Sequence, residues 1–110
     1  MSKILILKEH WLDLILSGEK SMEIRGAPLK AGTYYLGCKK NIYAVAAMGP
    51  PIAIATVDHW DSLRPQHRVQ SAELPYAKTF GMPILEVRRV NRMPFAHPRG
   101  AIGIVRYRAP

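Results

Sequence analysis

Four side chains that can bind anions or move protons lie close together near the N-terminus: Lys20, Ser21, Glu23 and Arg25. Because side chains alternate along a strand, Ser21, Glu23 and Arg25 would share one face and line a polar surface. A lysine beside an arginine and a carboxylate can bind an anion. Lys20 itself lies at the turn between helix and strand, where its side chain could point to either side. If burial and the nearby positive charge lower the pKa of Lys20, it can act as a base or nucleophile. The alternative is a ladder of exposed ion pairs, which contribute little to stability.

Basic and aromatic side chains elsewhere offer contacts for a nucleic acid. Lys39 and Lys40 follow Tyr34 and Tyr35, which places phosphate-binding cations near rings on which bases can stack. The two tyrosines face opposite sides of a strand, so at most one is expected to be exposed there. Arg99 lies in a Pro-Arg-Gly turn that would present it outward, as a phosphate contact or as an ordinary loop charge.

Other kinds of site have little support in the sequence. Asp58, His59 and His67 lack zinc-site spacing, and the single cysteine, Cys38, argues against a structural zinc centre. The glycines form neither a phosphate-binding loop nor a dinucleotide fingerprint. We therefore expect no metal and no cofactor. A single cysteine also excludes an internal disulfide framework and favours a reducing cytoplasm.

The charge balance is strongly basic. Sixteen lysines and arginines stand against eight acids, giving a formal net charge of +8. Residues 86–110 hold six arginines and one acid. Arginine binds phosphate in a bidentate manner and stacks on bases, so this composition favours a nucleic-acid or nucleotide partner over a surface that is merely soluble. No run of 18 apolar residues is present, so no membrane span is expected.

The hydrophobic pattern predicts one clear helix and five or six short strands. The helix covers residues 9–17, and Gly18 suits the position after its end. Residues 41–48 could be strand or helix, and residues 61–80 are expected to be a loop with at most one helical turn. The strands are predicted over residues 3–8, 20–25, 33–40, 52–59, 85–93 and 101–108.

These elements predict a single α+β domain over residues 1–110 with one hydrophobic core. Strands outnumber helices and turn signals are dense, so a small barrel or strongly curved sheet would cover the strand edges. Trp11 and Ile15 lie one turn apart on the helix. Both are expected to bury against the strand that carries Met22 and Ile24.

The front of the chain resembles the signature of the ASCH family, whose members are small β-barrels related to the PUA fold. The residues that carry the resemblance are Trp11, Ile15, Gly18, Lys20, Ser21, Glu23 and Arg25. A weaker likeness lies at residues 93–103, where a proline turn leads into the last strand. The resemblance implies a PUA-like β-barrel of five or six strands with one main N-terminal helix and a cleft beside that helix.

The resemblance also implies a function in that cleft. The family is associated with RNA binding, so Lys20, Arg25, Lys39, Lys40 and Arg99 become candidate contacts for RNA or a modified nucleoside. Some bacterial members hydrolyse the amide of acetylated cytidine, using a lysine, a hydroxyl residue three positions further on and a distant glutamate. Nuclease activity has been suggested for others.

Here Lys20 matches the lysine of the amidohydrolases, but Glu23 stands where they have a hydroxyl group. Ser21 offers a hydroxyl nearby, and Glu73 is a candidate for the distant glutamate. Three interpretations stay open: a module that binds RNA or a nucleoside, an amidohydrolase or ribonuclease that uses the same cleft, and a protein-interaction module with a basic surface.

Overall fold

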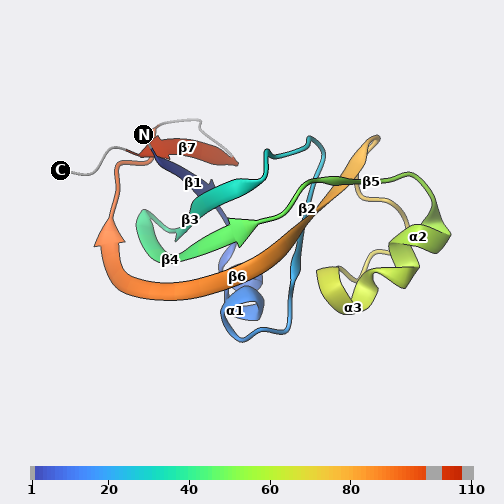
Figure 1. Ribbon diagram of the computed structural model, residues 1–110, viewed down its shortest axis with the longest axis horizontal. Helices are drawn as coiled ribbons and strands as arrows, with labels where there is room; N and C mark the ends of the chain where they lie inside the picture. Colours follow the sequence, from blue (N-terminus) through green and yellow to red (C-terminus); the bar gives the residue numbers. More distant parts are fainter. Residues whose placement is uncertain (1, 99–102, 108–110) are drawn as a thin grey trace.

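The computed structural model describes residues 2–98 and 103–107. These residues form one mixed sheet of seven strands and three helices (Figure 1). In chain order the elements are β1 (Ser2–Ile6), α1 (Glu9–Leu16), β2 (Met22–Arg25), β3 (Gly32–Cys38), β4 (Asn41–Met48), β5 (Ile52–Ile54), α2 (Val57–Ser62), α3 (Arg64–His67), β6 (Thr79–Pro94) and β7 (Ile104–Tyr107).

The strands follow the order β2-β6-β4-β3-β1-β7, and β5 also pairs with β6. Only the β1–β3 pair is parallel among these described strands. The long, curved β6 joins the two parts of the sheet. Its first residues pair with β2 and β5, and the remainder pairs with β4. As Figure 1 shows, α1 lies below the sheet, whereas α2 and α3 lie together at one end.

The β-barrel that the sequence predicted is not closed in the structure. In the described residues the sheet is open, because β2 and β7 stand at opposite ends of the strand order without pairing. Seven strands occur where five or six were predicted, and α2 and α3 join the single predicted helix. None of the helices in the described ranges has the length and apolar character needed to span a membrane.

The predicted strand over residues 52–59 is also wrong in its second half. The strand β5 stops at Ile54, and α2 begins because the Thr56 side chain accepts a 3.1 Å hydrogen bond from the His59 backbone N–H. This N-cap satisfies a donor that the first helical turn leaves without a partner. The β-branched residues favoured a strand, but the cap outweighs them here.

The helix α1 ends as predicted, with Ser17 at its C-cap and Gly18 at a positive φ of 83°. Its packing differs from the expectation. Ile15 is buried with the central strands, but Met22 and Ile24 pack in a different cluster with Ile54 and Trp60. The cluster around α1 includes Leu5, Leu7, Leu12, Ile15, Leu36, Ala44 and Met82.

Candidate functional site

A pocket of about 260 Å³ lies between β2 and the segment that follows β1. It brings together Lys20, Glu23 and Arg25, three of the four clustered residues singled out in the sequence. Apolar and aromatic groups from α1 and from the segment after α3 complete the wall. Its other lining residues are Ile6, Leu7, Lys8, Trp11, Ile24, Val69, Pro75 and Tyr76.

Lys20 is the buried cation of this pocket, with 2% of its surface exposed. Its backbone N–H donates to the Leu14 carbonyl, which fixes the residue directly after α1. The ammonium group donates a 2.5 Å hydrogen bond to the His67 carbonyl and lies 4.6 Å from the centre of the Trp11 ring. In the described part of the chain this is its only hydrogen bond, so two of its three N–H donors are open to a ligand.

Burial also changes the acidity of Lys20. Removal from water disfavours the charged form and lowers the pKa of Lys20 to about 8 from 10.5. The carboxylate of Glu23 opposes this effect, while the positive charge of Arg25 adds to it. Lys20 therefore loses its proton more readily than an ordinary lysine, which suits it to accept a proton as well as to donate hydrogen bonds.

Glu23 and Arg25 form a partly buried ion pair beside Lys20. The Arg25 Nε donates to Glu23 Oε2 at 2.7 Å, and the Glu23 side chain is 6% exposed. Among the described residues, Glu23 Oε1 has no hydrogen-bond partner, so it is available to accept a hydrogen bond from a ligand. This arrangement places an acceptor and two cations within one pocket.

Arg25 also spans the opening in the sheet. A second guanidinium nitrogen donates to the Ile6 carbonyl at 2.9 Å, so a side chain links β2 to the end of β1. The Ile6 backbone N–H donates to the Gly103 carbonyl at 2.6 Å, which brings the start of the last strand to the same place. Arg25 and Ile6, which make the link between β2 and β1, both line the pocket.

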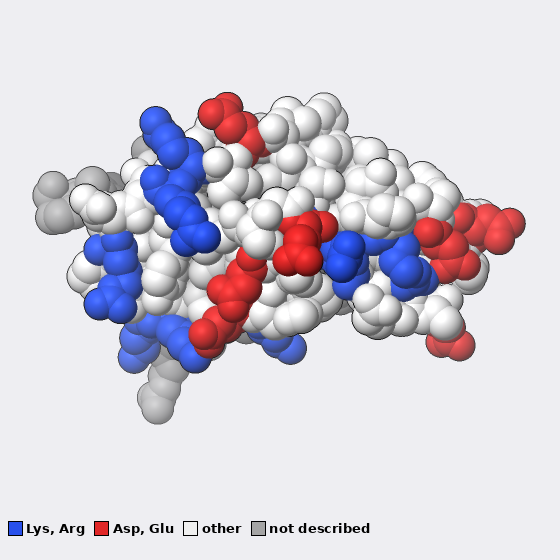
Figure 2. All heavy atoms as spheres, turned by 90° about the horizontal axis from the view of Figure 1, so that it is seen from below, with Lys and Arg blue, Asp and Glu red and all other residues white. Residues whose placement is uncertain are grey.

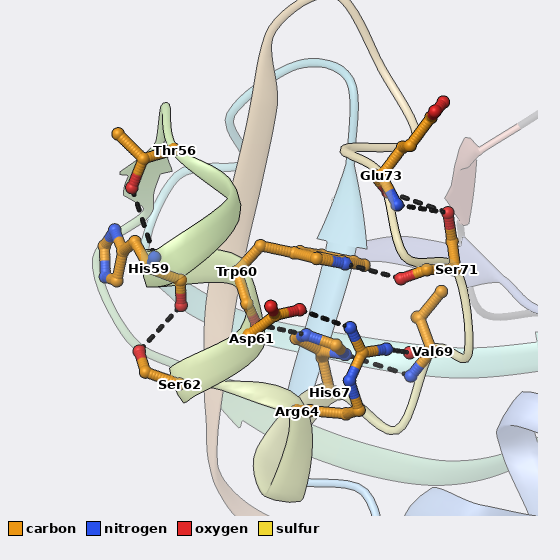
Figure 3. A network of polar contacts seen from close by, with 10 residues as sticks. All are labelled: Thr56, His59, Trp60, Asp61, Ser62, Arg64, His67, Val69, Ser71 and Glu73. Carbon is orange, nitrogen blue, oxygen red and sulfur yellow. Dashed lines mark hydrogen bonds and ion pairs between the residues drawn. The ribbon is translucent and has the colours of Figure 1, made fainter.

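The carbonyl group that accepts the hydrogen bond from Lys20 belongs to His67, whose ring stacks on that of Trp60 (Figure 3). This pair of rings was not predicted from the sequence. Trp60 and His67 are fully buried, and their rings lie 3.8 Å apart at 16°. The His67 Nδ1 accepts from the Val69 N–H and its Nε2 donates to the Trp60 carbonyl, each at 2.9 Å. This pattern requires the neutral ring, and burial lowers the pKa of His67 below 6.5.

A signal for this support was present in the sequence. Thr56 at an N-cap and Pro65 in the first turn of α3 are both typical of helix starts. Two short helices would place Trp60 and His67 close together. Their stacking could not be read from spacing alone, because it depends on the turn between α2 and α3.

Two of the candidate catalytic residues lie outside the pocket. Ser21 is exposed, and its backbone joins the Gln66 carbonyl and the Ile84 N–H, at 2.9 and 2.8 Å. Glu73 is exposed on the segment after α3, and Figure 3 shows its carboxylate pointing away from Trp60 and His67. The alternation that grouped Ser21 with Glu23 fails because the strand begins only at Met22.

The candidate phosphate contacts are dispersed. Lys39 and Lys40 form the β3–β4 turn, both at positive φ, and Lys39 makes an exposed 2.7 Å ion pair with Glu9. Arg99 lies outside the described residues. The face shown in Figure 2 carries its basic side chains in separate groups with acidic side chains between them. Within the described residues, no three His, Cys, Asp or Glu side chains gather where they could hold a metal ion.

Tyr76 closes the outer side of the pocket and is 47% exposed. Its ring packs over Gly26, where an added Cβ would lie 2.9 Å from Tyr76 Cδ1. Glycine at position 26 therefore lets this ring approach the end of β2. Two aromatic residues therefore line the pocket, Trp11 from α1 and Tyr76 from the later segment.

Comparison with solved structures gives the class of fold. The chain superimposes on an ASCH protein from Zymomonas mobilis with a TM-score of 0.74 at 12% identity, covering 97% of this chain and 87% of that one. A serine-to-alanine variant of the Zymomonas protein gives 0.78 at 13% identity, with 97% and 88% covered. A tyrosine-to-phenylalanine variant gives 0.71 at 12% identity, with 97% and 90% covered.

The chain therefore has an ASCH-like fold, as the sequence resemblance indicated. No protein-family model and no curated protein matches the sequence. The fold is the α+β architecture described above, built on an open seven-stranded sheet.

Proposed function

We propose that this protein binds RNA or a modified nucleoside and holds one nucleoside in the pocket beside α1. The observation that carries the proposal is that Lys20, Glu23 and Arg25 line one pocket together with the rings of Trp11 and Tyr76. Aromatic rings that stack on a base and polar groups that meet its edge are the usual means of recognising an unpaired base.

Each side chain has a definite part in this proposal. The open N–H donors of Lys20 point a positive charge at a carbonyl oxygen or ring nitrogen of the base. Glu23 Oε1 accepts from an exocyclic amino group, and Arg25 keeps the Glu23 carboxylate in place. Trp11 and Tyr76 provide the ring surfaces.

The size of the pocket favours a single nucleoside over a long bound strand. Its volume of about 260 Å³ is slightly below the usual range for pockets that hold drug-sized ligands. The separated basic groups in Figure 2 also differ from the continuous positive groove that follows a nucleic-acid backbone. Recognition in this pocket therefore relies on one base and its sugar.

Titration of the protein with uncharged nucleosides, including cytidine and N4-acetylcytidine, tests the proposal by calorimetry or NMR. We expect Lys20→Met to weaken nucleoside binding at least about tenfold, since one charge-assisted hydrogen bond is lost. Lys40→Met is the matched control, because Lys40 is exposed in the β3–β4 turn, away from the pocket. No binding by the wild-type protein, or equal losses in both variants, would refute the proposal.

A second candidate is hydrolysis of an acylated cytidine in the same pocket, and the lowered pKa of Lys20 favours it. Neutral Lys20 would take a proton from a water molecule that attacks the acyl carbonyl. The C–N bond then breaks, the proton returns to the departing amine, and cytidine and a carboxylate are released. Glu23 is the second acid–base group in the pocket, whereas Ser21 and Glu73 lie outside it.

A turnover assay with acylated cytidine distinguishes hydrolysis from binding. If Lys20 is the base, the rate should rise with pH through about 8, and Lys20→Met should abolish it. Incubation with a labelled RNA would detect ribonuclease activity in parallel. A protein that binds nucleosides but converts neither substrate is a binding module.

A further inference from the structure

A second pocket, of about 450 Å³, lies at the start of β1 and β3 and extends across the sheet. Its floor is a row of directly paired residues, Tyr35 on β3, Val45 on β4 and Arg88 on β6. Residues paired in this way share one face of a sheet. Leu36 follows Tyr35 and packs with α1, so the row lies on the face away from α1.

The lining of this pocket is basic. Lys3 from β1, Lys30 from the segment before β3, and Arg88 contribute three cations. No Asp or Glu occurs among its lining residues, and none of these cations forms an ion pair with a described carboxylate. Glu86 is on the same face two residues before Arg88 but does not line the pocket.

The rim of the pocket is held by specific contacts. Tyr34 is buried, and its hydroxyl donates a 2.6 Å hydrogen bond to the Lys30 carbonyl. Gly32 has a φ of 148°, which few other residues adopt, and turns the chain from Lys30 into β3. The Tyr35 ring meets Tyr107 edge-on, with centroids 5.5 Å apart. The backbone that carries Lys30 and the ring in the floor are therefore held in place.

We propose that this second pocket binds a phosphate group of a nucleotide, with Lys30 and Arg88 around the phosphate and the ring of Tyr35 beside the attached nucleoside. Guanidinium and ammonium groups are the usual partners of phosphate oxygens. The fixed ring favours a nucleotide over a simple acidic peptide, since bases stack on tyrosine. The choice of a nucleotide rests on the function proposed above, but the site does not require the first pocket.

The experiment compares two arginines that are adjacent on β6. Arg88 pairs with Val45 and Arg89 with Ala44, so the two exposed side chains lie on opposite faces of the sheet. Affinity for fluorescent oligouridylate and for uridine 5′-monophosphate is measured over a range of salt concentrations in three proteins. These are the wild type, the double variant Lys30→Gln with Arg88→Gln, and the control Arg89→Gln.

We expect the double variant to bind both probes about tenfold more weakly. For the oligonucleotide, the slope of the logarithm of affinity against the logarithm of salt concentration should be shallower by about 1.4 in the double variant. Each lost phosphate contact on a single strand accounts for roughly 0.7 of this difference. Amide signals of Tyr35 and Val45 should shift when the wild type binds. Binding of the mononucleotide but not the oligonucleotide would assign the phosphate to a free nucleotide, and tight binding of the oligonucleotide would assign it to RNA.

Several results would overturn the inference. These are no binding of either probe, equal losses in Arg89→Gln and the double variant, or equal competition by oligoglutamate, which would assign the pocket to acidic peptides. The first pocket is scored separately with uncharged nucleosides. Nucleoside binding that is lost in Lys20→Met but kept in the double variant supports the first pocket alone. Binding of the phosphate-bearing probes that is weakened in the double variant but kept in Lys20→Met supports the second pocket.

Discussion

At the scale of single residues, Lys20 is the most consequential side chain in the chain. It is buried, it donates to a backbone carbonyl, and it lies against the Trp11 ring. The sequence placed it at a turn with no fixed direction. The structure turns it inward, because the hydrogen-bond acceptor is on α3 and the desolvated ammonium is compensated there.

The lowered pKa of Lys20 predicts a stability that depends on pH. Between pH 8 and 10.5 the unfolded chain binds this proton more fully than the folded protein does, so the free energy of unfolding rises with pH in that window. Relative to Lys20→Met, the wild type should gain up to about 3 kcal/mol across it. Urea unfolding of both proteins at the two ends of the window measures this. The same pH dependence of unfolding free energy in both proteins would contradict a lowered pKa for Lys20.

Trp11 and Ile15 were both expected to be buried, and the structure separates them. Ile15 is 2% exposed, whereas Trp11 is half-buried and lines the pocket. Ile15→Ala should cost roughly 2–5 kcal/mol of unfolding free energy. Trp11→Ala should cost less than this and should weaken nucleoside binding instead. Chemical denaturation together with nucleoside titration distinguishes them, and a stability loss in Trp11→Ala as large as in Ile15→Ala would be contrary evidence.

At the scale of elements, the pocket depends on two short helices that the hydrophobic pattern did not reveal. Residues 61–80 lack a clean hydrophobic period, so they were expected to be a loop. The start of β6 was hidden for a related reason. The strand was expected only from residue 85, yet it begins at Thr79 and continues through Gly81 and Pro83, with Gly81 between β2 and β5. By contrast, α1 and its end at Gly18 were predictable, because its apolar face and its terminating glycine agree.

The N-cap of α2 should control the stability of this support. Thr56→Val removes the hydrogen bond to the His59 N–H and should cost about 1 kcal/mol. Ser62→Ala is the matched control, because the exposed Ser62 hydroxyl also bonds to His59, through its carbonyl, and should cost no more than about 0.5 kcal/mol. Thermal and urea unfolding give both values. Indistinguishable losses would mean that the cap does not hold α2.

At the scale of the whole molecule, the α+β class was predictable and the closure of the sheet was not. Alternation and turn residues identify strands, but whether the first and last strands pair depends on a few distant contacts. Here the described part of the sheet stays open, and the Arg25 side chain reaches Ile6 in place of a backbone ladder. The distribution of the basic excess was likewise not predictable from composition, since the adjacent Arg88 and Arg89 occupy opposite faces.

The link that Arg25 makes across the opening can be measured. Arg25→Met removes its bonds to Glu23 and Ile6 and leaves a buried carboxylate without its cation. We expect a loss of roughly 2–4 kcal/mol in the free energy of unfolding, toward the lower end of the cost of breaking a buried pair. Adding Glu23→Gln should restore part of that loss, because the unpaired charge is then gone. A double variant no more stable than Arg25→Met would argue against this coupling.

The bond between Lys20 and the His67 carbonyl joins residues 47 positions apart. If α2 and α3 opened locally, the ammonium would lose its acceptor, and the pocket would lose its cation in the same event. Ligand release and this local unfolding are therefore thermodynamically linked, so an occupied pocket should suppress the opening. Hydrogen exchange at the Val69 amide, which donates to His67, should slow when a nucleoside binds. Cleavage by a protease within residues 68–78 should slow by the same factor.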